Sequence, residues 1–243
     1  MGYEPRTYRR AVRATGLVTF EVSLKETDLQ VSAIRDLRDE AAVLICEVRD
    51  GLEGYIGAHP RFAESYVPLD VEPDAAPVVR SMAEAARMTG VGPMAAVAGA
   101  VAEYVARGLA DVSREVVVEN GGDLYLMGTV TRTVALWAGD SPLSGTVGIE
   151  VAGDALPLAV CTSSGRIGPS ASFGRAHTVT VIARDGALAD AAATALGYLV
   201  RVPADIDVAL AAARDIPGVL GAVVVLDEHI GAWGEVRLVP VTG

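Results

Sequence analysis

The chain has 243 residues and a formal net charge of −11, because 31 Asp and Glu residues outnumber 20 Lys and Arg residues. This acidic balance argues against binding to nucleic acid or to an anionic membrane surface, since both need a basic surface. Three histidines and two cysteines are too few for a disulfide framework, a cysteine-rich zinc module or a four-cysteine iron–sulfur cluster. Lys25 is the single lysine, so the sequence contains no Gly-Lys-Ser/Thr phosphate loop.

Hydrophobic residues make up 51% of the chain, which is typical of a globular protein organised as one domain or as two closely packed lobes. The longest uncharged stretch, 88–102, contains three glycines and a proline. It is too short to span a bilayer, which needs about 20 apolar residues. Four arginines near the N-terminus are followed by no apolar segment before Thr19. We therefore expect no signal peptide and a cytoplasmic protein.

Alternating apolar residues over 17–33 predict a two-stranded hairpin that turns at 25–28. Apolar residues then recur at helical spacing, which predicts a helix over 39–58 that ends before Pro60. Cys46 lies beside the apolar stripe of this helix, so we expect a core position for it. Further helices are expected over 74–89 and 93–109.

Short apolar runs separated by Gly, Asp and Ser predict the strands of an antiparallel sheet. These runs lie at 116–119, 124–127, 134–138, 145–151, 158–161 and 178–183. Two helices are expected next, over 187–200 and 205–214, and the runs 219–226 and 234–241 predict a final hairpin. Helices that occur in blocks beside a meandering sheet indicate an α+β fold.

The turn Gly90-Val91-Gly92 and the residues after it fit the dinucleotide pattern G-x-G-x-x-A. In a Rossmann fold that pattern follows a strand, whereas here it follows an expected helix, which argues against a Rossmann site. Two interpretations remain. Gly90 and Gly92 either form a helix–helix turn or allow an anion to approach the N–H groups of the next helix.

Two polar segments at strand ends could contact a ligand. Asn120, Gly121, Gly122 and Asp123 form either a plain hairpin turn or a turn that a ligand can approach closely. Residues of the second segment follow the strand 158–161 and suit a pyrophosphate or a carboxylate, although a simple polar loop is the alternative. They are Thr162, Ser163, Ser164, Gly165 and Arg166.

Candidate reactive side chains are sparse. Cys161 ends a strand and is either a reactive thiol or a core residue. No two histidines have local metal-ligand spacing, which disfavours zinc. Asp190 and Thr194 lie one turn apart on one face of a helix, opposite its apolar face. They could share a hard cation such as Mg²⁺, or this face could simply be solvated.

These segments resemble, in the same order, the signature segments of the ApbE-type FAD:protein FMN transferases. The resemblance covers roughly residues 75–200, and the helix with Asp190 and Thr194 is its most specific part. With the segment 25–29 included, the whole chain is similar to a shorter, uncharacterised ApbE-like family. The segments that carry the resemblance are 120–123, 161–165, 177–183 and 188–197.

The resemblance implies one domain over 1–243 with ApbE-like, T-fold-derived architecture, and it implies FAD and Mg²⁺ as cofactors. Asp190 and Thr194 would be the metal ligands, the glycine turn 121–122 and Asp123 would border the flavin, and the loop 162–166 would hold its phosphates. The activity implied is transfer of FMN from FAD to a protein Ser or Thr. A flavin or another small dinucleotide and a second copy of the chain are the expected partners.

This chain departs from the transferases at one segment. They carry a His-x-x-Asp-Pro motif before the metal-binding helix, whereas here a short loop over 167–176 replaces it. His177 is the nearest candidate for a catalytic histidine. The sequence therefore leaves open a Mg²⁺-dependent flavin or nucleotide enzyme, a non-catalytic flavin-binding protein, and a protein of sulfur assimilation that uses Cys161.

Overall fold

The computed structural model describes residue 9 and residues 14–165 and 174–241. Within these residues, eight strands form one antiparallel sheet in the order β1-β2-β3-β4-β7-β8-β9-β10, and three form a second sheet in the order β11-β6-β5. The expected α+β fold is confirmed. The strands of the larger sheet are β1 (Val18–Leu24), β2 (Thr27–Ala33), β3 (Val116–Asn120), β4 (Asp123–Met127), β7 (Leu158–Ser163), β8 (Thr178–Ala183), β9 (Val219–Leu226) and β10 (His229–Gly234). Those of the smaller sheet are β5 (Arg132–Ala135), β6 (Val147–Val151) and β11 (Leu238–Pro240).

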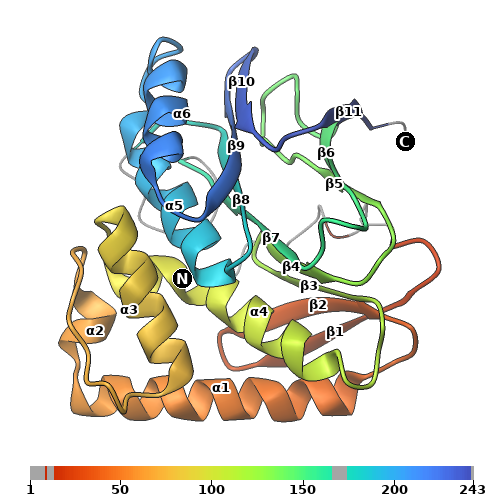
Figure 1. The fold of residues 1–243 in the computed structure, drawn as a ribbon, viewed down its shortest axis with the longest axis vertical. Helices are drawn as coiled ribbons and strands as arrows, with labels where there is room; N and C mark the ends of the chain where they lie inside the picture. The colour runs from red at the N-terminus through yellow and green to blue at the C-terminus, as the bar shows by residue number, and fades with distance from the viewer. Residues whose placement is uncertain (1–8, 10–13, 166–173, 242–243) are drawn as a thin grey trace.

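Helices cover one face of the large sheet, and the small sheet lies against its other face (Figure 1). Strand β4 illustrates this division, because Tyr125 packs among the helices while Leu126 packs in the core on the opposite face. Successive residues of a strand point to opposite faces, so one strand supplies both cores. The helices are α1 (Arg38–Ala58), α2 (Arg61–Glu64), α3 (Pro77–Thr89), α4 (Val97–Leu109), α5 (Gly186–Leu199) and α6 (Asp205–Asp215). Within the described ranges, none of them has both the length and the apolar character of a membrane span.

Most predicted elements are confirmed to within a few residues. The N-terminal hairpin pairs Leu24 with Thr27 around a turn in which Lys25 has a φ of 52°. Helix α3 begins at Pro77 rather than at 74, because proline suits the first turn of a helix. The segment 93–96 is a single 3-10 turn that precedes α4.

The predicted final hairpin is wrong. Strand β9 pairs with β10, whose residues 229–234 the sequence does not mark as a strand, and β11 instead pairs with β6 in the small sheet. Asp227 adopts a φ of 54° in the short turn between β9 and β10, and such turns favour a tight hairpin. Strand β10 is largely exposed, so the alternation that marks a half-buried strand is weak there.

Helix α1 corrects the expectation for Cys46, which is exposed. The buried face of α1 carries Ala41, Ile45, Val48 and Leu52, at the spacing of one helical stripe. A residue next to this stripe is rotated by about 100° around the helix axis, and at position 46 that rotation turns the side chain to solvent.

Truncation of α1 tests this assignment. We expect Ile45→Ala to lower the free energy of unfolding by about 2–5 kcal/mol, because Ile45 is fully buried. Val43→Ala in the same helix is the matched control, since Val43 is 58% exposed, and it should change stability by less than about 0.5 kcal/mol. Urea unfolding followed by circular dichroism measures both. Equal losses for the two variants would contradict the assigned face.

Candidate functional site

Asp190 lies at the junction of helices α4 and α5. It is 9% exposed, and its Oδ2 accepts a hydrogen bond from the backbone N–H of Gly99 at 2.9 Å. Helix α4 has no side-chain cap from its own N-cap residue, Ala96. A carboxylate at a helix N-terminus satisfies free N–H groups and interacts favourably with the helix dipole. Asp190 of α5 therefore serves as the cap of α4, and the solvated face considered from the sequence is wrong.

A residue of helix α4 makes the reciprocal contact with the N-terminus of α5. Glu103 accepts a hydrogen bond from the backbone N–H of Gly186, the first residue of α5, with its Oε2 2.6 Å away. Each acid lies four residues after a glycine, and each glycine N–H binds the acid of the other helix. A Cβ at Gly99 would overlap the carbonyl oxygen of Gly186, and a Cβ at Gly186 would overlap that of Gly99. The close crossing therefore requires glycine at both positions.

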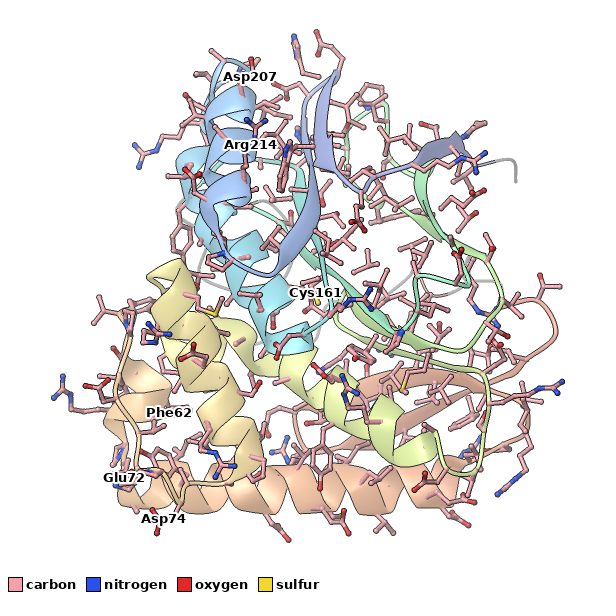
Figure 2. All side chains as sticks on the ribbon, in the orientation of Figure 1. Phe62, Glu72, Asp74, Cys161, Asp207 and Arg214 are labelled. Atoms are coloured by element: carbon pink, nitrogen blue, oxygen red, sulfur yellow. The ribbon has the colours of Figure 1, made fainter. Side chains whose placement is uncertain are left out.

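Asp123 and Cys161 lie next to Asp190. Asp123 is 5% exposed, and its Oδ1 accepts the backbone N–H of Thr162 at 3.0 Å. Cys161 is 1% exposed, with its Sγ 3.7 Å from the carbonyl oxygen of Gly186, beside the first turns of α5 (Figure 2). We refer to Asp123, Cys161 and Asp190 together as the acid cluster.

All three members of the acid cluster have raised pKa values. Burial raises the pKa of Asp190 to about 7. Burial, and after it the charge of Asp190, raises the pKa of Asp123 well above its usual range. Burial and the neighbouring Asp123 also raise the pKa of the Cys161 thiol, so this cysteine is protonated and enclosed. That environment is typical of a structural cysteine rather than of a reactive one.

The glycine turn leads directly into the acid cluster. Gly121 and Gly122 have φ angles of 69° and 104°, which matches a tight hairpin turn between β3 and β4. Asn120 donates from its Nδ2 to the carbonyl oxygen of Ala98 at 3.1 Å. The turn is thereby tied to the same N-terminus of α4 that Asp190 caps.

The strand-end loop starts beside this turn. Thr162 and Ser163 end β7, and the Oγ1 of Thr162 lies 2.9 Å from that of Thr180. Gly165 donates its N–H to the carbonyl oxygen of Ala176 at 3.0 Å, and Ser164 lies between Ser163 and Gly165. Arg166 and the loop positions 167–173 lie outside the described residues.

Gly90 and Gly92 lie in the turn after α3, whereas Thr194 lies on the same helix as Asp190. Gly90 ends α3 in a left-handed conformation with a φ of 76°, and Gly92 packs against the backbone of Ser65. Both observations favour the interpretation of Gly90 and Gly92 as a helix–helix turn. Thr194, one turn after Asp190 on α5, is partly buried. A ligand-binding role for these three residues stays a prediction.

His177 is held between two polar partners. It is 2% exposed, and its Nδ1 accepts the backbone N–H of Asp227 at 3.0 Å. Because Nδ1 accepts, the proton of a neutral imidazole lies on Nε2, which donates to Asp140 Oδ1 at 2.9 Å. These contacts join the segment before β8 to the β9–β10 turn and to the loop between β5 and β6. They suit a structural histidine, and a catalytic role for His177 stays a prediction.

Sequence reasoning missed Glu103 and the pairing of Gly99 with Gly186. The one signal was a glycine followed four residues later by an acid in two separate helices. Within the described part of the chain, no group of three or more His, Cys, Asp or Glu side chains is arranged to hold a metal ion.

The glycine crossing generates a stability prediction. Gly99→Ala should lower the free energy of unfolding by about 1–3 kcal/mol, because the added methyl meets backbone atoms of α5. Gly54→Ala in α1 is the matched control, since a Cβ there has no neighbour within 4 Å, and it should raise stability by about 0.5–1 kcal/mol. Denaturant titration distinguishes the two signs. A stabilising Gly99→Ala would contradict the close crossing.

The raised pKa of Asp190 generates a pH prediction. With a folded-state pKa of about 7 and an unfolded value of about 3.9, the folded protein keeps a proton that the unfolded chain loses. The contribution of Asp190 to stability therefore falls as pH rises from about 4 to about 7. Asp190→Asn cannot ionise, so its stability relative to wild type should increase across this window. Unfolding titrations without divalent cations measure the difference, and a pH-independent difference would contradict the assignment.

Comparison with known proteins identifies the family. The family model described as "AbpE bacteria" matches residues 9–229. A UPF0280 protein of Methanococcus aeolicus is 37% identical over 222 residues, which cover 89% of this chain and 90% of that protein. A UPF0280 protein of Methanocaldococcus jannaschii is 38% identical over 221 residues, with 88% and 90% covered.

The fold is shared more widely. The structure of the flavin transferase ApbE from Vibrio cholerae superimposes with a TM-score of 0.57 at 14% sequence identity, over 90% of this chain and 96% of that one. At this identity the likeness establishes the fold alone. The family match spans nearly all of the described residues, and the curated relatives align over most of their own length. The chain therefore belongs to the ApbE-like family described as "AbpE bacteria", and the resemblance seen in its sequence is confirmed.

Proposed function

We propose that this protein binds a flavin dinucleotide together with a divalent cation at the acid cluster, and that it transfers the FMN half of FAD. The observation that carries the proposal is a buried pair of acids, in which Asp123 directly follows the glycine turn and Asp190 lies beside it on α5. A further support is the fold, which the chain shares with the flavin transferase ApbE of Vibrio cholerae.

The residues present fit a divalent cation. Two buried carboxylates with raised pKa values gain stability when a positive charge neutralises them. Asp190 and the Thr194 hydroxyl would hold the ion. Mg²⁺ is commonly bound by one or two carboxylates, with water and substrate phosphates completing its shell. A site with few protein ligands therefore suits Mg²⁺ with a bound pyrophosphate. When bound, the ion would neutralise charge on that pyrophosphate.

The chain's own residues have separate tasks in this proposal. Gly121 and Gly122 have no side chains, so they let the ligand approach the backbone closely. The hydroxyl groups of Thr162 and Ser163 offer hydrogen bonds to phosphate oxygens. The Asp123 carboxylate, fixed by the N–H of Thr162, holds the strand end against the turn. Cys161 stays protonated beneath α5 and takes no part in transfer.

The test is binding and turnover of FAD with and without MgCl₂. We expect FAD to bind more tightly with Mg²⁺, and AMP to appear together with a flavin adduct detected by mass spectrometry. Asp190→Asn should weaken the Mg²⁺-dependent binding at least tenfold, because it removes the charged ligand. Asp207→Asn is the matched control. Asp207 is exposed on α6, distant from Cys161 in Figure 2, and its replacement should leave binding unchanged.

The outcomes separate the alternatives. FAD binding without AMP release would identify a non-catalytic flavin-binding protein, in keeping with the missing His-x-x-Asp-Pro segment. A colourless purified protein that binds no FAD by calorimetry, with or without Mg²⁺, would contradict both forms of the proposal. An equal effect of Asp190→Asn and Asp207→Asn would remove Asp190 from the site.

A further inference from the structure

The guanidinium of Arg9 is a buried positive charge. Its side chain is 5% exposed, and its Nε donates to Glu119 Oε2 at 2.6 Å. Its Nη1 donates to Asp28 Oδ2 at 3.0 Å, and its Nη2 donates to the carbonyl oxygen of Asp28 at 2.8 Å. One guanidinium thus joins the start of the described chain to the β1–β2 hairpin and to β3. Only arginine presents donors in this forked arrangement.

Glu119 links the Arg9 guanidinium to the glycine turn. Its second carboxylate oxygen, Oε1, accepts the backbone N–H of Gly122 at 2.7 Å. The carboxylate therefore bridges the Arg9 guanidinium and the turn. Gly122 adopts a φ of 104°, a conformation that glycine reaches readily.

The glycine turn also fixes the position of Asp123 and Thr162, which lie at the proposed ligand site. Asp123 follows Gly122 directly, and its carboxylate holds the N–H of Thr162. Loss of Arg9 would remove the guanidinium that binds Oε2 of the buried Glu119, whose charge acts on Asp123. A buried carboxylate that loses a charged donor is destabilised, so Glu119 would take up a proton or change its orientation. Either change weakens the hydrogen bond to Gly122.

We infer that Arg9 is a positioning residue that acts through Glu119 to set the Gly121-Gly122 turn for ligand binding. The inference rests on the proposed function, in which the turn borders the flavin dinucleotide. It assigns a role to the N-terminal segment, whose arginines the sequence analysis left without a function.

The test combines FAD affinity with amide exchange at Gly122. Arg9→Met and Glu119→Gln should each raise the Kd for FAD about tenfold, and the double variant should be no worse than either, because both remove the same bridge. In the ligand-free protein, Arg9→Met should speed hydrogen exchange of the Gly122 amide at least tenfold. Arg87→Met is the matched control. Arg87 forms an exposed ion pair with Glu84 on α3, and its loss should change neither quantity.

Arg9→Lys keeps the inference testable if Arg9→Met fails to fold. Lysine retains the charge but cannot donate to Glu119 and Asp28 in the same forked geometry, so it should fold and still bind FAD more weakly. A lower melting temperature with unchanged Kd and unchanged Gly122 exchange would overturn the inference, because it would mark Arg9 as purely structural. If the wild-type protein binds no FAD, the proposed function fails, and exchange at Gly122 alone decides whether Arg9 sets the turn.

Discussion

The reciprocal capping of α4 and α5 is the contact on which the rest of the site depends. Asp190 binds the N–H of Gly99 and Glu103 binds the N–H of Gly186, so each helix supplies the acid that the other needs. Free N–H groups at a buried helix N-terminus must find acceptors. Here one N–H of each helix finds its acceptor on the other helix, and Asp185 additionally caps α5 by accepting the N–H of Leu188. The absence of side chains at Gly99 and Gly186 lets the two backbones approach closely enough for both bonds.

This arrangement explains why the carboxylate of Asp190, a residue of α5, is buried. The N–H groups at the start of α4 stabilise the charged form of Asp190, yet burial outweighs them and raises its pKa. Asp123 lies alongside, and burial together with the charge of Asp190 raises its pKa. The fold therefore tolerates two acids in its interior because each satisfies backbone donors. In the proposed function, a cation together with a phosphate-bearing ligand would neutralise this pair of acids.

Much of the fold followed from local sequence patterns. The N-terminal hairpin, α1 and the glycine turn were predictable because alternation, helical spacing and a Gly-Gly pair report backbone conformation directly. Two expectations failed for a common reason. Cys46 and strand β10 both lie at the edge of an apolar pattern, where one residue of rotation or a weak alternation decides exposure.

The sequence by itself determined the fold class, the family and the order of the polar segments, because short-range periodicity and motif spacing are written along the chain. The tertiary structure alone decided which of those segments meet. It paired Gly99 with Gly186, linked Arg9 to Glu119 across 110 positions of sequence, and tied His177 to Asp140 rather than to the acid cluster. Hydrogen bonds between distant elements depend on how helices cross and strands register, and neither is encoded in the spacing of residues within one segment.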